Sequence, residues 1–429
     1  MGLRLHRLGE LYHGRRRAAG ATRAVVNLVV LVTMKLRSAL GFVALSTFTL
    51  LGCPSPEAKA PPAPEPHDAP PAPTPEAPAA AKVEVPDNGV VDVAAFAGHR
   101  CLVRKNGAIA CWGKGSYGQL GQGKREDSSA LVAVASVTDA IDVGVGRDFS
   151  CAVRRSGKVA CWGNDEDGQL GRGKGLAPGQ SSQTPVEVVG LSDVTAISVG
   201  EFHACALGKN GTVSCWGNGE HGQLGRSVKR GSDTPLAVES LSGVAEIAVG
   251  ASHSCARLSS GEVRCWGRNT EGQLGAGVTG GRANPVVVSG LTDAKRIASG
   301  HLHSCAVRGD DSVVCWGDQK TLELGGPALP EKRSKTPIVV PGLRGVTAIA
   351  GGARHTCAVL SSGSTSCWGD GAAGELGKPE APTGEPREVA AGKGATRLAL
   401  GDGASCALRA DGTGSCWGAG SVELGAATP

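Results

Sequence analysis

The chain has 429 residues, with 66 glycines, 24 prolines and 15 cysteines but only 7 Trp, 5 Phe and 2 Tyr. This much glycine argues against an all-α protein, and so many cysteines favour an oxidising compartment. The formal net charge of +5 is concentrated in residues 1–52, and residues 53–429 hold 36 basic and 38 acidic residues, a net charge of −2. Because the body lacks bulk positive charge, we expect no nucleic-acid partner.

An export signal is predicted near the N-terminus. From Met34 the sequence has two basic residues and then an apolar run that ends just before Cys53. The run is short for a transmembrane helix and has the three-part pattern of a signal peptide. We therefore expect a leader over 1–52, with a signal peptide at 34–52 and with 1–33 as a mis-assigned start. An uncleaved membrane anchor is the alternative.

The residues Leu50–Cys53 resemble the bacterial lipobox, in which the cysteine thiol receives a diacylglyceryl group and cleavage follows the small residue before it. The resemblance implies an exported lipoprotein acylated at Cys53, and Ser55 implies the outer rather than the inner membrane. Several acyl chains hold a protein stably on a membrane, whereas one chain binds marginally. Residues 53–81, rich in proline and alanine, are then an extended spacer between the membrane and the body.

The other fourteen cysteines show that the body is repetitive. They form seven pairs whose members are ten residues apart, and each second cysteine is followed by Trp-Gly. First members recur every 49 to 54 residues, and a period of this length indicates a repeat architecture. The pairs are Cys101 with Cys111, Cys151 with Cys161, Cys205 with Cys215, Cys255 with Cys265, Cys305 with Cys315, Cys357 with Cys367 and Cys406 with Cys416.

Each period contains four short runs with the composition of strands, as at Val186–Val188, Ala196–Val199, Cys151–Arg154 and Lys158–Trp162. Runs of β-branched and small residues that end in Gly, Asp or Ser are typical of strands. Four strands in each of seven repeats predict an all-β protein, a seven-bladed β-propeller with four-stranded blades over 82–429.

The ends of the body predict how the ring closes. Internal repeats continue into a Pro-x-x-Val strand, as at Pro185–Val188, but the sequence stops at Pro429 where the last such strand is expected. A similar strand, Lys82–Val85, precedes the first repeat, with Val83 18 residues before Cys101. We expect this N-terminal strand to complete the last blade and close the ring.

The order G-x-x-H-x-C-A, G-x-V-x-C-W-G and G-Q-L-G, found at Gly200–Ala206, Gly211–Gly217 and Gly222–Gly225, resembles the regulator of chromosome condensation repeat. The resemblance covers 82–429 and implies a seven-bladed propeller that serves mostly as a protein-binding scaffold. Members of this family act as an exchange factor for a small nuclear GTPase, bind nucleosomes, sense ultraviolet light or inhibit bacterial β-lactamases.

Several positions depart from the family pattern. Phe149 and Ala404 replace the repeated histidine, and Glu323, Glu375 and Glu423 replace the glutamine of G-Q-L-G. Every tryptophan lies in the repeat motif, so the tryptophan-rich face of the light sensor is missing. No repeat has a long insertion that would act as an exchange wedge, and we therefore do not transfer exchange activity.

Disulfides are the expected state of the seven cysteine pairs. Residues ten apart across a short turn fall on the same face of adjacent strands, where opposed Cβ atoms lie ~4.5–5.5 Å apart. A small adjustment reaches disulfide geometry. Zinc and reduced thiols are the alternatives, but structural zinc cysteines usually come two to four residues apart.

No catalytic motif is found: the sequence has no G-x-S-x-G, no H-E-x-x-H and no Walker loop. We expect no enzyme activity, no cofactor and no metal. The repeated tryptophan is interpreted as packing between blades, with one acceptor for its indole N–H. The repeated histidine is interpreted as a structural hydrogen-bonding group rather than a metal ligand, at His99, His203, His253, His303 and His355.

The segments between G-Q-L-G and the next Pro-x-x-Val strand vary in length and charge, and we predict that they are binding loops on one face of the propeller. One holds the basic pair Lys229 and Arg230, and another holds Lys332, Arg333 and Lys335. Solvated loops without a binding role are the alternative for each cluster.

Together these features favour a monomeric, non-enzymatic, lipid-anchored propeller whose loop face binds a protein or a cell-surface polymer. A periplasmic or surface enzyme inhibitor of the β-lactamase-inhibitor type is the first alternative. Guanine-nucleotide exchange is the second, and it conflicts with an export signal because it requires access to the cytosol. A polysaccharide lyase or glycosidase would need carboxylates that converge in the folded chain.

Overall fold

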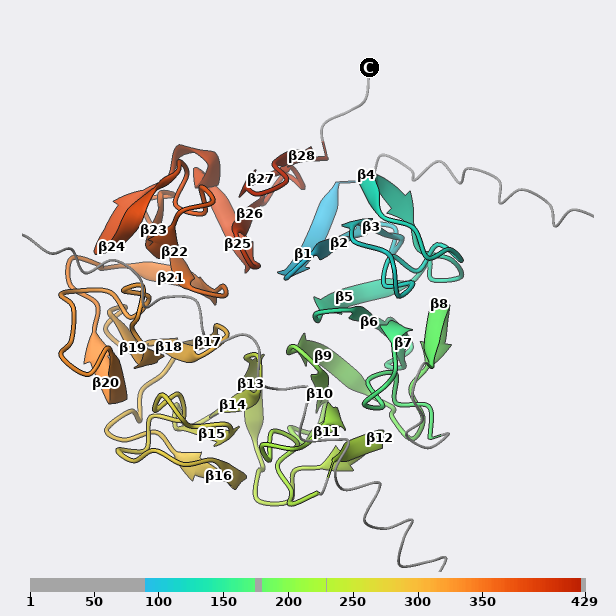
Figure 1. Cartoon of the computed structure of the whole chain (residues 1–429), viewed down its shortest axis with the longest axis horizontal. Helices are drawn as coiled ribbons and strands as arrows, with labels where there is room; N and C mark the ends of the chain where they lie inside the picture. Colours follow the sequence, from blue (N-terminus) through green and yellow to red (C-terminus); the bar gives the residue numbers. More distant parts are fainter. Residues whose placement is uncertain (1–88, 174–179, 229, 426–429) are drawn as a thin grey trace, which may run out of the picture. The chain divides into compact units, whose positions relative to one another are not determined.

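Seven four-stranded antiparallel sheets lie around a common axis (Figure 1). The computed structural model describes residues 89–173, 180–228 and 230–425, all within one compact unit. In each sheet the first strand in sequence is innermost and the fourth is outermost. The predicted all-β propeller, with seven blades of four strands, is confirmed. Among the described residues, no helix has the length and apolar character needed to cross a membrane.

The strands follow one another around the ring in chain order, four to a blade. Blades 1 and 2 consist of β1 (Val90–Phe96), β2 (His99–Arg104), β3 (Ile109–Gly113) and β4 (Ser128–Ala133), and of β5 (Ala140–Val145), β6 (Phe149–Arg154), β7 (Val159–Asn164) and β8 (Ser181–Glu187). Blades 3 and 4 consist of β9 (Val194–Val199), β10 (His203–Gly208), β11 (Val213–Asn218) and β12 (Gly231–Ala237), and of β13 (Val244–Val249), β14 (His253–Leu258), β15 (Val263–Gly267) and β16 (Arg282–Val287). Blades 5 and 6 consist of β17 (Arg296–Ser299), β18 (His303–Val307), β19 (Val313–Asp318) and β20 (Arg333–Val339), and of β21 (Val346–Gly351), β22 (His355–Leu360), β23 (Thr365–Gly371) and β24 (Glu380–Glu388). The 3₁₀ helix η1 (Ala390–Gly392) follows, and blade 7 consists of β25 (Ala395–Leu400), β26 (Ala404–Arg409), β27 (Gly414–Gly418) and β28 (Val422–Leu424).

All seven predicted disulfides are present, one in each blade. The two cysteines of a pair are directly opposed on the second and third strands, as Cys151 and Cys161 are on β6 and β7, and the sulfur atoms of the pairs are 2.05 to 2.13 Å apart. The ten-residue spacing produces this register because the second and third strands are joined by a tight hairpin, as at Gly157 with a φ of 76°. The bridges join Cys101 to Cys111, Cys151 to Cys161, Cys205 to Cys215, Cys255 to Cys265, Cys305 to Cys315, Cys357 to Cys367 and Cys406 to Cys416.

The hydrophobic core is divided among the seams between neighbouring blades. At the first seam, Val103, Ile109 and Leu120 of blade 1 pack in one cluster with Val143 and Trp162 of blade 2. Each tryptophan therefore covers the blade before its own, as the predicted inter-blade packing requires. This shared burial stabilises the ring because no blade can cover its own apolar face alone.

A hydrogen-bonded chain of four groups joins blades 1 and 2. His99 Nε2 lies 2.8 Å from Ser150 Oγ, which donates to the carbonyl oxygen of Gln119 over 3.1 Å. Trp162 Nε1 donates to the same carbonyl over 2.8 Å. Because the serine proton is used on the carbonyl, the histidine must be the donor to Ser150 and carries its proton on Nε2. This confirms the structural role predicted for the repeated histidine and tryptophan.

The histidine and its hydroxyl partner are lost together. Where Phe149 replaces histidine, the next blade has Ala204 in place of serine, and where Ala404 replaces it, the next blade has Arg100. All five remaining histidines face a Ser or Thr hydroxyl at 2.8 to 3.0 Å. The pairing across the seam explains why a change on one blade is matched on the next.

Among the described residues, the last blade has a fourth strand of its own. The outer position of the last blade is filled by β28, in which Val422 pairs with Cys416 and Leu424 with Gly414. The predicted closing strand, Lys82–Val85, lies outside the described residues, as do the leader 1–52, Cys53 and the spacer 53–81. The sequence Val422–Leu424 corresponds to the G-Q-L-G turn of the other repeats, and here it extends along β27 instead.

Candidate binding face

The predicted binding loops share one end of the propeller with the turns that surround its axis. Consecutive turns of an antiparallel sheet alternate between its two ends, so the turns after the first and third strands lie together. Backbone bonds confirm this, as from Asn218 N to Phe202 O (2.8 Å) and from Asp318 N to Leu302 O (2.9 Å). We call this end the loop face, and the end with the hairpins between second and third strands the hairpin face.

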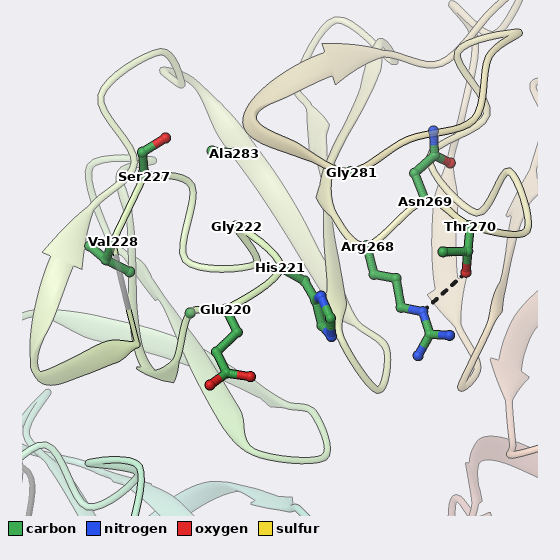
Figure 2. A pocket seen from close by; sticks show the side chains of 11 residues that line it. Glu220, His221, Gly222, Ser227, Val228, Arg268, Asn269, Thr270, Gly281 and Ala283 are labelled. Atoms are coloured by element: carbon green, nitrogen blue, oxygen red, sulfur yellow. Dashed lines mark hydrogen bonds between the residues drawn. The ribbon is translucent and has the colours of Figure 1, made fainter. Parts of the chain in front are cut away.

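A groove of about 460 Å³ opens on the loop face between blades 3 and 4 (Figure 2). One wall is the turn that follows β11, and the other is the turn that follows β15. Figure 2 shows Glu220 and His221 on the first wall and Arg268 on the second. The lining residues are Gly219, Glu220, His221, Gly222, Ser227, Val228, Arg268, Asn269, Thr270, Gly281 and Ala283.

Some polar groups of the groove build its walls and others remain available to a partner. Asn269 is buried and holds its loop, because its Nδ2 donates to Val278 O over 2.8 Å and its Oδ1 accepts from Leu274 N. Arg268 Nε donates to Thr270 Oγ1 over 3.1 Å, and no other described residue bonds to its guanidinium. Glu220 and His221 are exposed. The groove therefore presents an acid, an imidazole and a guanidinium to the solvent.

The structure brings both predicted basic loops to the edges of this groove. The carbonyl oxygen of Arg230 accepts from Gly219 N over 2.7 Å on one side. On the other side Arg333 Nη1 donates to the carbonyl oxygen of Thr270 over 3.1 Å. Lys229 lies outside the described residues. Two loops about a hundred residues apart in sequence thus flank one groove, which no periodicity in the sequence indicates.

The two basic clusters differ in net charge. Arg333 lies 3.4 Å from Glu331 and 3.7 Å from Glu271, and Lys335 lies 3.7 Å from Glu331. Lys332 is exposed. The second cluster is therefore largely neutralised by its own acids. Arg230 is exposed and Arg268 is bonded to a neutral hydroxyl, and in the part of the chain that the structure describes neither forms an ion pair.

A second feature of the loop face lies at the axis. Arg147 Nη1 forms a 2.7 Å ion pair with Glu201, and its guanidinium lies 5.6 Å from the centre of the Phe202 ring. Across the axis of the propeller, Phe96 of blade 1 stacks on His301 of blade 5, and the centres of the two side-chain rings are 4.8 Å apart. Burial lowers the pKa of His301 and keeps its imidazole neutral. Aromatic and arginine side chains from blades 1, 2, 3 and 5 therefore lie at the inner end of their blades on the loop face.

Sequence reasoning missed this axial group and the groove residues Glu220, His221 and Arg268. A signal for Phe96 was present, since every other repeat has glycine five residues before its first cysteine. Four of those glycines make room for a histidine ring, as Gly250 does for His253, whose Cε1 would lie 2.2 Å from an added Cβ, and Gly146 makes room for the Phe149 ring in the same way. The glycines are Gly146, Gly200, Gly250, Gly300, Gly352 and Gly401.

The groove of the loop face is lined largely by polar and charged side chains. Within the described ranges, no three His, Cys, Asp or Glu side chains gather in an arrangement that would hold a metal ion. The histidines of the repeat are buried, and burial lowers the pKa of His253 to about 3, so its imidazole stays neutral and bonded to the Ser304 hydroxyl.

Comparison with protein families decides where the chain belongs. The RCC1-like domain matches residues 51–341, more than half of the chain. The chain belongs to the RCC1-like domain family. The resemblance seen in the repeat motif is thereby confirmed for the family.

Curated relatives align with about a third of this chain. The chain is 33% identical to the human E3 ubiquitin-protein ligase HERC2 over 142 residues, which is 33% of this chain and 3% of HERC2. It is 28% identical to the ultraviolet-B receptor UVR8 of Arabidopsis thaliana over 153 residues, 34% of each chain. The chain thus spans about a third or less of the length of these relatives.

Solved structures share the fold at low identity. Prp20p from Saccharomyces cerevisiae, described with its binding properties to Gsp1p and histones, has a TM-score of 0.63 at 21% identity and covers 73% of this chain and 80% of its own. Human WBSCR16 has a TM-score of 0.64 at 22% identity and covers 74% of this chain and 85% of its own. These likenesses show the RCC1-like fold.

Proposed function

We propose that this RCC1-like propeller is a non-enzymatic scaffold that binds a protein partner through its loop face, with the groove between blades 3 and 4 as the contact. The observation that carries the proposal is a 460 Å³ groove that is lined by Arg268 and bordered by the loop of Arg230, two arginines that lack ion pairs with described residues. Guanidinium groups bind carboxylates in a bidentate way. An acidic segment of the partner is therefore the expected occupant.

Protein binding by similar propellers supports the proposal. Yeast RCC1 (Prp20) is known in a structure bound to Kap60, and Prp20p is described with its binding to Gsp1p and histones. The groove adds a reason particular to this chain, because loops of three neighbouring blades meet there. The axial group of Arg147, Phe202 and Phe96 extends the same surface toward the centre of the ring.

We further propose that the propeller is exported and held on the cell envelope by a lipid on Cys53, in the outer membrane. Support comes from the lipobox pattern at Leu50–Cys53 and from seven disulfides, which are typical of exported proteins. The mass of the mature protein tests this directly. A lipid adduct on an N-terminal Cys53 is expected, and an unmodified chain that retains residues 34–52 would contradict it.

Site-specific crosslinking tests the binding face. A photo-crosslinking residue at the exposed Ser227, in the groove, is expected to capture a partner from an envelope extract, whereas the same residue at the exposed Ser156, on the hairpin face, is not. The captured protein is identified by mass and then purified for a binding titration. Equal capture from both positions would contradict a groove-specific partner.

Charge reversal tests the named residues with the purified partner. Arg230→Glu together with Arg268→Glu is expected to weaken binding by a factor of ten or more, about 1.4 kcal/mol. Arg155→Glu with Lys209→Glu is the matched control, because both residues are exposed and lie near the hairpins of blades 2 and 3. Lys332→Ala, Arg333→Ala and Lys335→Ala together are expected to have a smaller effect, since two of these three cations are already paired.

A further inference from the structure

Two blades with the same turn use different chemistry to hold it. In blade 3, Gln223 Nε2 donates to Asn218 Oδ1 over 2.9 Å, so two neutral amides close the turn that follows β11. In blade 5 the corresponding residues are Asp318 and Glu323. Both turns start with the same kind of hydrogen bond. The backbone N–H of Glu220 donates to the Asn218 side chain, and in blade 5 the backbone N–H of Lys320 donates to the Asp318 side chain. A pair of carboxyl groups therefore occupies the place of a pair of amides.

Both carboxyl groups are buried. Asp318 is 6% exposed and Glu323 is 2% exposed. Glu323 Oε2 accepts from the backbone N–H of Thr321 over 2.7 Å. Asp318 Oδ2 lies 3.3 Å from Lys320 Nζ, but its Oδ1 is buried and has no hydrogen-bond partner among the described residues. An unpartnered buried carboxylate oxygen is unfavourable, so this position calls for a donor.

The surrounding charges do not neutralise two carboxylates. Lys320 is the cation in contact with Asp318, and it is shared with Glu271 at 3.3 Å. Glu271 in turn lies 3.7 Å from Arg333. Two acids, Asp318 and Glu271, thus share one lysine, and Glu271 also shares Arg333 with Glu331. Two neighbouring carboxyl groups in such a site do not both ionise readily, and the first proton lost leaves the second more tightly held.

We propose that Asp318 and Glu323 hold one proton between them, so that Glu323 donates to the Asp318 carboxylate as Gln223 donates to Asn218, and that loss of this proton loosens the adjoining binding loop. Burial, with the charge of Asp318, raises the pKa of Glu323 to about 6. Burial also raises the pKa of Asp318. The loop is accordingly ordered below about pH 6 and loosened above it.

The residue next to the acid pair connects it to the loop. Gln319 Oε1 accepts from Leu329 N over 2.9 Å, and its Nε2 donates to Pro327 O over 3.0 Å. The backbone N–H of Gln319 donates to Lys332 O over 2.8 Å. The side chain and backbone of one residue therefore hold the segment that leads into the predicted basic cluster. The inference rests on the proposed function only where it calls this segment a binding loop.

Blade 6 provides a comparison within the same chain. It has Asp370 and Glu375 at the corresponding positions, and burial raises the pKa of Glu375. There, however, Arg354 Nη2 lies 3.1 Å from Asp370, and both Asp370 oxygens have bonded partners or solvent, because neither is a buried atom without a partner. Asp370 thus has an arginine partner, whereas Asp318 shares its lysine with Glu271.

Isosteric amides test the proposal without any partner. The variant Asp318→Asn with Glu323→Gln copies the amide pair of blade 3 and removes the titration. Its melting temperature is expected to exceed that of the native protein at about pH 7.5, and the difference is expected to shrink or vanish at about pH 5, where the native pair holds its proton. A difference that stays constant between these pH values would overturn the proposal.

Two further measurements separate the pair from the rest of the molecule. Carboxyl ¹³C shifts in the native protein are expected to show Glu323 titrating above the ordinary glutamate range, and Asp318→Asn is expected to lower that pKa. Amide exchange over residues 326–332, corrected for its intrinsic pH dependence, is expected to lose protection above pH 6 in the native protein only. The reciprocal variant Asn218→Asp with Gln223→Glu should transfer this pH dependence to blade 3. An ordinary Glu323 titration, or equal exchange in native and amide proteins, would reject the proposal while leaving the partner experiments above unaffected.

Discussion

Arg100 of the first blade donates from Nη2 to the carbonyl oxygen of Ala419 in the last blade over 2.6 Å, across 319 positions of sequence. It stands where the other seams place a small side chain or a hydroxyl, and it is 9% exposed. The seam has a second link in the 3.1 Å ion pair between Arg397 and Asp92. A third is the backbone bond from Val90 N to Gly412 O, which repeats the bond from Ala140 N to Gly107 O at the next seam. The ring is therefore closed by contacts between blades 7 and 1.

Replacing Arg100 tests this seam. Arg100→Leu removes the hydrogen bond to the carbonyl of the exposed Ala419, and we expect a loss of about 0.5–1.5 kcal/mol in the free energy of unfolding. The measurement is urea unfolding of the oxidised protein. Arg155→Leu, at an exposed hairpin position, is the control and is expected to change stability by less than about 0.5 kcal/mol. Equal effects of the two variants would show that the seam does not depend on Arg100.

Trp112 provides a test of the predicted closing strand. Its indole Nε1 is buried and has no partner among the described residues, whereas Trp162 and Trp417 donate to the preceding blade over 2.8 and 2.7 Å. The missing acceptor corresponds to the carbonyl of Glu423, which is drawn into β28. If Lys82–Val85 takes the outer position, as the sequence predicts, this segment can form its turn and supply the acceptor.

Deleting residues 82–86 should then lower the melting temperature of the chain, because the last blade loses its outer strand and Trp112 its acceptor. Deleting the five spacer residues 62–66 is the matched control, and we expect it to leave the melting temperature unchanged. Trp112→Phe should be destabilising in the full chain and nearly neutral after deletion of 82–86. Equal melting temperatures for the two deletions would leave β28 as the closing strand.

The fold is well predicted from the sequence because the spacing of residues within each repeat determines the geometry of a blade. A Cys spacing of ten residues specifies the hairpin and its register, and the recurring histidine and tryptophan specify the seam between blades. The position of Arg268 in the same groove as the loop of Arg230 is different, since it depends on how two neighbouring blades are rotated and on loops of unequal length. Phe96 and the acid pair of blade 5 are only partly predictable from the sequence. Their unusual residue types are visible in the aligned repeats, but only the folded ring shows that Phe96 meets His301 or that Asp318 Oδ1 has no donor among the described residues.

The disulfides are expected to supply a large part of the stability. Cys255→Ser with Cys265→Ser removes one bridge between residues ten apart, and the chain-entropy model predicts a loss of about 2–3 kcal/mol in the free energy of unfolding. Urea unfolding under oxidising conditions measures this loss. Because the bridge acts within one blade, the same change at Cys305 and Cys315 should have a similar effect. Under reducing conditions the native protein should fall below both variants, and unchanged stability on reduction would contradict this role.

The buried histidines make the propeller sensitive to acid. Burial lowers the pKa of His99, His203, His253 and His303 from 6.5 to about 3 and that of His355 to about 4. Above pH 6.5 these imidazoles are neutral in both the folded and the unfolded chain. Below it the unfolded chain takes up protons that the folded chain refuses, so stability falls as the pH drops toward 3.

Removing one histidine should make this dependence shallower. The variant His253→Phe with Ser304→Ala copies the seam where Phe149 faces Ala204, and it is expected to reduce the slope of unfolding free energy against pH by up to about 1.4 kcal/mol per pH unit. Urea unfolding at a series of pH values between about 6.5 and 4 provides the slope. Ser304→Ala alone keeps the titrating imidazole and should lower stability while leaving a steep slope. The two variants differ in one titrating group, the imidazole of His253. A slope that is unchanged in the double variant would therefore show that His253 does not contribute to acid unfolding.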